Sequence, residues 1–243
     1  RNFFFLIMVF LVIPLLLTAC KDQSPIRINK IKCNSKESPV GVGTKGLSFS
    51  WQMTSSQRNQ RQSAWQIVVG KSRKALEEGE YLWDSGKEKG SQNLHLPYEG
   101  PTLEPASSYY WKVKVLDKEG NASKWSSVGS FVTGLFEKED WSGAQWIAYE
   151  TILDSMKIVP GVHGNGSNLG DKGKRRPVVP RFRKEFQVEK PIKEALLFIT
   201  GLGHYEANLN GRKVGDRFLS PGWTDYQETV LYNTYDITDK LQA

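Results

Sequence analysis

The sequence predicts an all-β protein in which two consecutive antiparallel β-sandwiches follow a lipoprotein signal peptide. Three observations predict this fold class. Short runs of alternating apolar and polar residues recur along the chain, turn residues separate these runs, and helix-forming segments are scarce. The roughly 220 residues that follow the signal are enough for two small domains, each with its own hydrophobic core.

The N-terminal segment predicts export rather than a folded element. Arg1 precedes an apolar run that reaches Leu17, and the segment ends in Leu-Thr-Ala-Cys at residues 17–20. This ending resembles the bacterial lipobox, in which a signal peptidase cleaves before the cysteine and the thiol is acylated. A transmembrane anchor is the alternative, but Pro14 interrupts the run, which is slightly shorter than the ~20 residues that span a bilayer.

We therefore expect residues 1–19 to be a signal peptide, Cys20 to be the lipidation site and residues 20–24 to be a tether. The chain would then be an exported lipoprotein anchored in a membrane, at the outer membrane and cell surface or in the periplasm. Acylation of Cys20 leaves Cys33 as the only free thiol, so no intrachain disulfide is expected.

The positive charge of the chain gathers in one segment. The formal net charge is +7, and removal of the signal leaves 32 basic against 26 acidic residues. Residues 171–184 carry seven basic side chains and one acidic side chain, so the rest of the chain is neutral. A charge excess within one segment that glycine and proline interrupt is typical of a solvated loop. Nucleic acid is therefore not an expected partner.

Residues 25–134 predict the first sandwich. The period-two pattern is clearest in SYYWKVKVLD (residues 108–117), and similar runs are GLSFSWQM, SAWQIVVG, YLWDSG and VGSFVTG. In the clearest run one set of alternating side chains is Tyr110, Lys112 and Lys114, and the other is Trp111, Val113 and Val115. Several such strands with regular turns predict a β-sandwich.

The segment LEPASSY (residues 103–109) resembles the tyrosine corner of fibronectin type III and immunoglobulin-like domains. The resemblance implies that the hydroxyl of Tyr109 is hydrogen bonded to the preceding backbone and fixes the turn. We then expect Trp51, Trp111 and Trp125 to be core or sheet-face residues, with sugar stacking by one of them as the alternative.

One helical turn is expected between strands of this sandwich. Residues 75–78 are helix formers, and Gly79 follows them. The carboxylates of Glu77, Glu78 and Glu80 are sequence neighbours on a polar turn. We expect them to be solvated rather than catalytic, because a general acid and base face one another across a substrate.

The sandwich pattern ends near GLFEKEDWSGAQWIAY (residues 134–149), where a charged linker precedes a predicted strand, WIAY. Residues 150–180 lack apolar periodicity and predict a long loop. Its glycines do not form a phosphate-binding loop, because Gly164, Gly166 and Gly170 have one residue too many for G-x-G-x-x-G, and no G-x-x-x-x-G-K-[ST] occurs.

Residues 135–243 predict the second sandwich, jelly-roll-like and incomplete at its C-terminal end. Strand signals are RFRKEFQV, EALLFITG, HYEANLNG and TVLYNTYDIT. In the third run one face carries Tyr205, Ala207 and Leu209, and the other carries Glu206, Asn208 and Asn210. Asn210-Gly211 predicts a type I′ hairpin turn, and Pro221-Gly222 predicts a type II turn.

The stretch GLGHYEANLNGRKVGDRFLSPGWTDY (residues 201–226) closely resembles the N-terminal β-sandwich of bacterial α-L-rhamnosidases, a glycoside hydrolase family. The family pattern is G-x-G-x-Y-E-x-x-L-N-G-x-x-V-G-D, then P-G-W-T-D-Y, then Y-x-T-Y-D-[VI]-T. The resemblance covers roughly residues 141–241, and an immunoglobulin-like module before it fits the usual architecture of the family.

The resemblance implies removal of rhamnose by an inverting mechanism, with an acidic pair on a downstream (α/α)-barrel that this chain lacks. No residue is therefore expected to be catalytic, and the chain alone is expected to be inactive. The implied partners are rhamnose-containing carbohydrate and the downstream catalytic domain of the full-length protein.

Some members of the family carry a calcium-assisted rhamnose site on such a sandwich, which needs oxygen ligands and an aromatic platform. Suitable residue types for sugar binding are Glu206, Asn208, Asn210, Trp223, Asp225 and Tyr226. Calcium would lie near Asp216 and Asp225. The alternative is structural: turn geometry explains Asn210, and packing against a neighbouring strand explains Trp223 and Tyr226.

Two functional hypotheses remain from different classes. The chain is either the non-catalytic front of an α-L-rhamnosidase or a stand-alone carbohydrate-binding or adhesion lipoprotein. The sequence has no H-E-x-x-H, no G-x-S-x-G and no Cys-His cluster, and His95, His163 and His204 are isolated from one another. The reading frame after Ala243 discriminates between the two hypotheses.

Replacement of Cys20 tests the lipobox. We expect metabolic labelling with a radioactive fatty acid to mark the wild-type protein and Cys20→Ala to abolish both labelling and membrane association, because the thiol is the acylated group. Cys33→Ala is the matched control and should keep the label. Labelled, membrane-bound Cys20→Ala protein would contradict the hypothesis.

Overall fold

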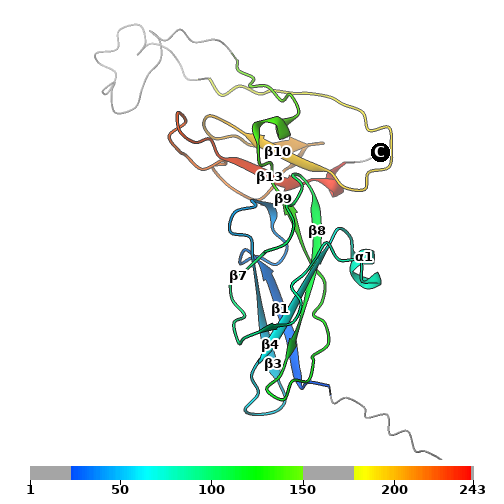
Figure 1. Cartoon of the computed structure of the whole chain (residues 1–243). Coiled ribbons are helices and arrows are strands. Elements are labelled where there is room, and N and C mark those ends of the chain that lie inside the picture. Colours follow the sequence, from blue (N-terminus) through cyan, green and yellow to red (C-terminus); the bar gives the residue numbers. More distant parts are fainter. Residues whose placement is uncertain (1–22, 150–177, 242–243) are drawn as a thin grey trace, which may run out of the picture. The chain divides into compact units, whose positions relative to one another are not determined.

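The computed structural model describes residues 23–149 and 178–241 (Figure 1). The predicted signal peptide 1–19, Cys20 and most of the predicted loop 150–180, with His163, lie outside the described residues. The chain divides into two compact units, Arg1–Thr133 and Gly134–Ala243. Within the described parts, no helix combines the length and apolar character needed to cross a membrane.

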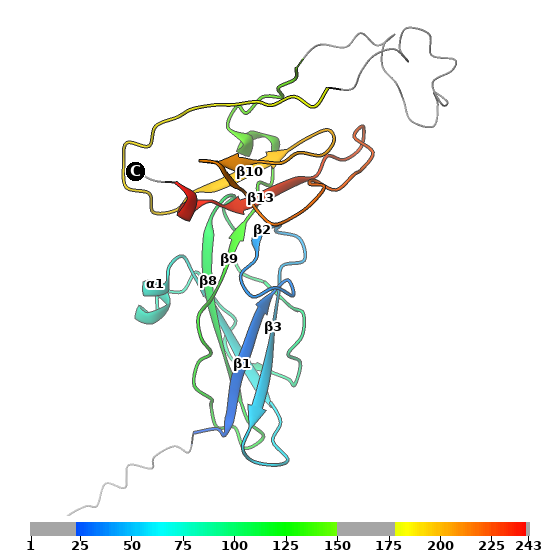
Figure 2. The same cartoon turned by 180° about the vertical axis from the view of Figure 1, so that it is seen from behind.

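The first unit contains two β-sheets. One has the order β1-β3-β7, with β1 at Ile26–Cys33, β3 at Ser48–Ser55 and β7 at Leu96–Pro97. The other has the order β2-β9-β8-β4-β5, with β6 also paired to β4. Its strands are β2 (Val40–Val42), β4 (Ala64–Gly70), β5 (Trp83–Asp84), β6 (Glu88–Lys89), β8 (Ser108–Leu116) and β9 (Gly129–Thr133). All pairs are antiparallel except β2 with β9, and Figure 2 shows the long strands running along this unit.

Aromatic residues fill the core of the first unit. Phe49 on β3 and Trp111 on β8 are fully buried, and their ring centroids lie 4.5 Å apart. Gly129 on β9 lies over Trp111, where an added Cβ would come within 2.8 Å of the indole Nε1. Only glycine allows this close approach, so the backbone of β9 packs directly against the indole ring of Trp111.

The alternation predicted for residues 108–117 is confirmed. From Ser108 to Val115 along β8 the buried side chains are Tyr109, Trp111, Val113 and Val115, and those between them are half-buried. Trp51 is also buried, whereas Trp125 is a half-buried face residue whose ring lies 5.0 Å from Lys112 Nζ and 4.7 Å from Lys114 Nζ.

The predicted tyrosine corner is confirmed. Tyr109 is 1% exposed, and its hydroxyl accepts a hydrogen bond from the Glu104 backbone N–H at 2.8 Å. Its ring stacks on Phe131 with centroids 5.4 Å apart. The hydroxyl of Thr133 donates to the Glu104 carbonyl at 2.7 Å, so both backbone groups of Glu104 are bound.

The short helix also agrees with the sequence. Helix α1 (Arg73–Glu78) begins at Ser72, whose hydroxyl accepts from the Ala75 N–H at 3.0 Å, and ends at Gly79 with a φ of 81°. Glycine adopts this left-handed conformation without a steric penalty. Lys112 donates from Nζ to the Leu76 carbonyl at 2.7 Å. The three carboxylates Glu77, Glu78 and Glu80 are exposed, as expected.

Cys33 lies in the core with no exposed surface. Burial raises the pKa of its thiol to about 12, because a thiolate would lose its hydration there. At neutral pH the group is a neutral apolar side chain, so its role is packing rather than chemistry.

The second unit has two sheets of two strands each among its described residues. Strand β10 (Leu196–Thr200) pairs with β13 (Tyr232–Asp236), and β11 (Asn208–Leu209) pairs with β12 (Arg212–Lys213), both antiparallel. The described residues of this unit also form two 3-10 helices, η1 (Lys138–Trp141) and η3 (Thr238–Lys240). Within this unit the ring of Trp141 packs edge-on against Tyr232, with centroids 5.4 Å apart.

The hairpin between β11 and β12 confirms the predicted type I′ turn. Asn210 and Gly211 have φ angles of 50° and 75°, both in the left-handed region. Leu209 pairs with Arg212, so the loop contains only these two residues.

Three local predictions for the second unit are wrong. Neither residues 146–149 nor residues 181–188 form a strand. Large apolar side chains of both segments are exposed, including those of Phe182 and Phe186, and neither segment pairs with a described strand. Alternation alone does not supply a hydrogen-bonding partner. Gly222 does not adopt positive φ, so no type II turn forms, and the Ser220-Pro221 peptide bond is cis.

Removal of the tyrosine-corner hydroxyl tests the first unit. We expect Tyr109→Phe to lower the free energy of unfolding by about 1 kcal/mol, because the Glu104 N–H loses its acceptor. The matched control is Tyr110→Phe, whose hydroxyl makes no hydrogen bond to a described residue and which should change stability by less than about 0.5 kcal/mol. Urea unfolding measures both, and equal effects would contradict the role of the corner.

Candidate carbohydrate-binding surface

The seven predicted sugar- and calcium-site residues all lie in the second unit, on the β11–β12 hairpin and in the segment that follows it. All are exposed except Tyr226, which is half-buried. The structure divides them into three places: the hairpin face around Glu206, the hairpin turn at Asn210, and the turn around Trp223.

Glu206 is held by two neighbours on the hairpin. Lys213 Nζ lies 3.1 Å from Glu206 Oε2, and Asn208 Nδ2 donates to Oε1 at 3.2 Å. These hydrogen bonds, with that from Lys213 the larger influence, lower the pKa of the Glu206 carboxyl. Lys213 also lies 4.7 Å from the centroid of the Phe218 ring. The face thus offers a fixed carboxylate beside an exposed aromatic ring.

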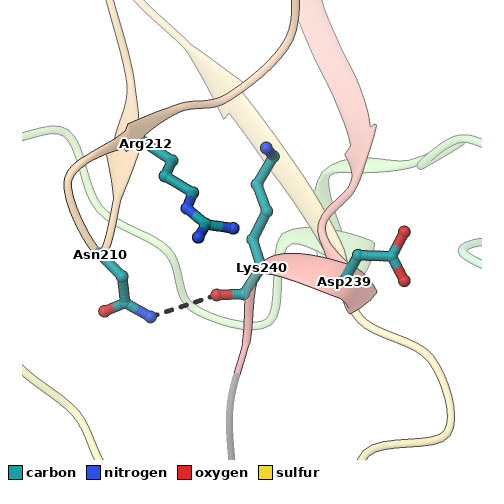
Figure 3. A pocket seen from close by; sticks show the side chains of 4 residues that line it. All are labelled: Asn210, Arg212, Asp239 and Lys240. Atoms are coloured by element: carbon teal, nitrogen blue, oxygen red, sulfur yellow. Dashed lines mark hydrogen bonds between the residues drawn. The ribbon is translucent and has the colours of Figure 1, made fainter.

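Asn210 lines a shallow pocket of about 150 Å³ with Arg212, Asp239 and Lys240. Figure 3 shows the guanidinium of Arg212 extending between Asn210 and Lys240, while the carboxylate of Asp239 points away. Asn210 Nδ2 donates to the Lys240 carbonyl at 3.1 Å, which ties the hairpin turn to η3. Arg212 makes no ion pair with a described residue, so its N–H donors are available to sugar hydroxyls or a carboxylate.

The turn around Trp223 contradicts part of the structural explanation, in which Trp223 packs against a neighbouring strand. Trp223 is 74% exposed, so packing against a neighbouring strand does not explain it. Asp225 fixes the turn, because its Oδ1 accepts from the Gln227 N–H at 3.0 Å and its carbonyl accepts from Thr229 N–H at 2.8 Å. The turn therefore presents an indole ring to solvent beside the half-buried Tyr226.

The residues for calcium are not gathered into a carboxylate cluster. Within residues 23–149 and 178–241, no three His, Cys, Asp or Glu side chains lie together in a group that could hold a metal ion. Asp216 is exposed, and Asp225 already caps its own turn. A calcium ion near them would depend on amide, carbonyl and water oxygens.

Sequence reasoning missed Arg212, Asp239 and Lys240 as lining residues. Asp239 and Lys240 follow β13 and lie about thirty positions beyond the hairpin, and the pairing of β13 with β10 places them. No local pattern links the two segments. The Asn-Gly turn was the available signal, but it indicates geometry rather than a pocket.

The described residues thus form an immunoglobulin-like sandwich followed by a second β unit with an exposed polar and aromatic surface. Residues 28–137 match the family model described as "Rha78A-like, N-terminal immunoglobulin domain". Residues 190–243 match the family model described as "Alpha-L-rhamnosidase N-terminal domain". The chain thus matches the N-terminal, non-catalytic portion of α-L-rhamnosidases, as the sequence motifs predicted.

Relatives agree with this assignment. An α-L-rhamnosidase of Formosa agariphila is 32% identical over 230 residues, which is 93% of this chain and 24% of the relative. One of Alteromonas sp. (strain LOR) is 31% identical over 202 residues, which is 82% of this chain and 20% of the relative. The chain therefore spans about a quarter of the length of the curated relatives it matches.

Solved structures show the same correspondence. The α-L-rhamnosidase of Dictyoglumus thermophilum has a TM-score of 0.73 and 32% identity, covering 91% of this chain and 24% of that one. The α-L-rhamnosidase of Aspergillus terreus has a TM-score of 0.66 and 25% identity, covering 89% and 22%. The predicted all-β fold with an immunoglobulin-like first domain is confirmed.

Replacement of Trp223 tests whether the ring supports the fold. We expect Trp223→Ala to change the free energy of unfolding by less than about 0.5 kcal/mol, because the ring is exposed. Trp141→Ala, in the same unit, should cost about 1 kcal/mol or more through loss of the edge-on contact with Tyr232. Chemical unfolding compares them, and a larger loss for Trp223→Ala would restore the packing explanation.

Proposed function

We propose that this chain is the front of an exported, lipid-anchored α-L-rhamnosidase that acts on rhamnose-containing glycans or glycosides. The observation that carries the proposal is the presence, in order, of both N-terminal domains of that family in a chain that spans a quarter of its relatives. The two units then serve as scaffold and as carbohydrate-recognition surface for a catalytic domain further along the polypeptide.

The chemistry of the described carboxylates supports a non-catalytic role. Inverting hydrolysis of a glycoside needs two carboxyl groups roughly 6.5–9.5 Å apart across a cleft that holds a sugar and a water. Glu206 is paired with Lys213, and Asp225 caps a turn. Glu77 and Glu78 lie at the exposed end of α1, and Glu80 lies in the exposed turn after it. None of these groups faces a partner acid across a pocket.

Carbohydrate recognition by the second unit rests on the exposed groups described above. The Trp223 ring offers an apolar face for stacking on a sugar ring, and Asn210 and Arg212 offer hydrogen-bond donors at a shallow pocket. A lipid anchor at Cys20 would hold the protein at a membrane.

A stand-alone carbohydrate-binding lipoprotein is the second candidate. It is favoured by the location of Trp223, Asn210 and Arg212, which are all solvent-accessible on this chain without any further domain. The two candidates differ in the coding sequence of the gene beyond Ala243, which contains a catalytic domain in the first case and a stop codon in the second.

Turnover of an aryl α-L-rhamnoside tests the proposal. We expect the purified chain alone to release no rhamnose, because the carboxylates discussed above do not face one another across a pocket, and a protein extended through the downstream reading frame to hydrolyse the substrate. Rhamnose release by the chain alone would contradict the assignment of roles. A stop codon directly after Ala243 would favour the stand-alone binding protein.

A further inference from the structure

A second pocket lies on the first unit. It has a volume of about 160 Å³ and is bordered by β1, β3 and the loop that precedes β7. The side chains that matter for its chemistry are those of Lys30, Lys32, Ser35, Leu94 and His95.

A β-bulge determines which side chains of β1 enter this pocket. The register between β1 and β3 shifts between Ile28 and Lys30, so Asn29 is the extra residue. Before the bulge Ile26 and Ile28 face the core, and after it Ile31 and Cys33 do. Strict alternation would place Lys30 on the face of Ile28, and the bulge instead turns it outward.

The two lysines on the outer face form no ion pair with a described residue. Lys30 pairs across the sheet with Gln52 and Lys32 with Ser50, and both partners are neutral. Within the described parts of the chain neither ammonium group is in an ion pair, whereas Lys71 of the same unit lies 2.7 Å from a Glu104 oxygen. Two positions on one strand are about 6.6 Å apart, so both flexible side chains reach one anion between them.

The opposite wall of the pocket is a rigid loop. The amide of the buried Gln62 accepts from Trp51 Nε1 at 3.0 Å and donates to the carbonyls of Gly90 and Gln92 at 3.1 and 2.9 Å. Asn93 exchanges hydrogen bonds with the Trp51 backbone, accepting at 3.0 Å and donating from Nδ2 at 2.9 Å. The core thus fixes the loop up to the residues that border the pocket.

The loop ends by presenting two exposed side chains. Leu94 is 57% exposed, and His95 has a φ of 54°, a left-handed conformation that few residues other than glycine adopt. The His95 N–H donates to Ser50 Oγ at 2.9 Å, which holds the residue in this conformation beside the lysine pair. Such an arrangement, maintained by its surroundings at a local cost, is typical of binding sites.

We propose that Lys30, Lys32 and His95 form an oxyanion-binding site that takes a carboxylate or sulfate group of an acidic saccharide. The lysines supply charge, the imidazole N–H and the Ser35 hydroxyl supply directed donors, and Leu94 covers the apolar side of the ligand. The site itself stands on the geometry of the first unit. The choice of a saccharide as carrier of the anion rests on the proposed function.

Titration calorimetry of the whole chain at low salt tests the site, with a glucuronate-containing oligosaccharide and a sulfated oligosaccharide as probes. Neutral oligosaccharides of the same length, inorganic sulfate and phosphatidylglycerol vesicles are the comparison ligands. The variant is Lys30→Gln/Lys32→Gln. Its matched control, Lys45→Gln/Lys87→Gln, removes the same charge from exposed, unpaired positions of the same unit. Circular dichroism confirms that both variants fold.

We expect at least one acidic oligosaccharide to bind, its neutral counterpart not to bind, and the Lys30/Lys32 variant to bind at least about tenfold more weakly, with the control unchanged. Inorganic sulfate should compete for the site. Equal affinity in wild type and variant, or an equal loss in the control, would overturn the site. Binding to the vesicles alone would overturn the saccharide. Because no hydrolysis is measured, failure here leaves the rhamnosidase assay unaffected.

Discussion

The contact of Phe49 with Trp111 is the interaction on which the first unit depends. It joins a strand of one sheet to the central strand of the other, and the two rings lose all their exposed surface. Burial of side chains of this size supplies most of the favourable free energy of such a small sandwich. The absence of a side chain at Gly129 lets β9 lie directly on the indole. The strands, the tyrosine corner and the rigid loop are all arranged around this aromatic centre.

The same core positions surface chemistry. Trp51 is buried in the same core, and its indole N–H requires an acceptor, which Gln62 provides. Gln62 in turn fixes the loop that presents Leu94 and His95. The hydrogen bond that satisfies the buried indole of Trp51 therefore also fixes this loop at the surface. A loop that is already fixed loses less conformational entropy when a ligand binds.

The second unit relies on a different constraint. Its described strands form two small sheets, and few of their side chains are fully buried. Turns and their hydrogen bonds hold much of this unit in place. Examples are the Asn210-Gly211 hairpin turn, the turn that Asp225 caps, and the hydrogen bond from Asn210 to the Lys240 carbonyl. Polar groups that hold turns remain at the surface, where they also border the pocket. Structural and binding roles for Asn210 are therefore compatible.

The sequence alone determined the features that depend on local chemistry or on family motifs. Alternation in residues 108–117, the tyrosine corner, the stop at Gly79 and the Asn-Gly turn each need only a few neighbouring residues, because they follow from backbone geometry and one burial face. Strand pairing was not determined in this way. Residues 181–188 alternate but find no partner among the described strands.

Only the tertiary structure decided which distant residues meet. The pairing of β13 with β10 brings Lys240 to Asn210, and the bulge at Asn29 turns Lys30 toward His95, sixty-five positions away. It also left Trp223 exposed, where the sequence had favoured a packed ring. Pairing register and burial depend on contacts between segments far apart in the chain, and local patterns do not encode those contacts.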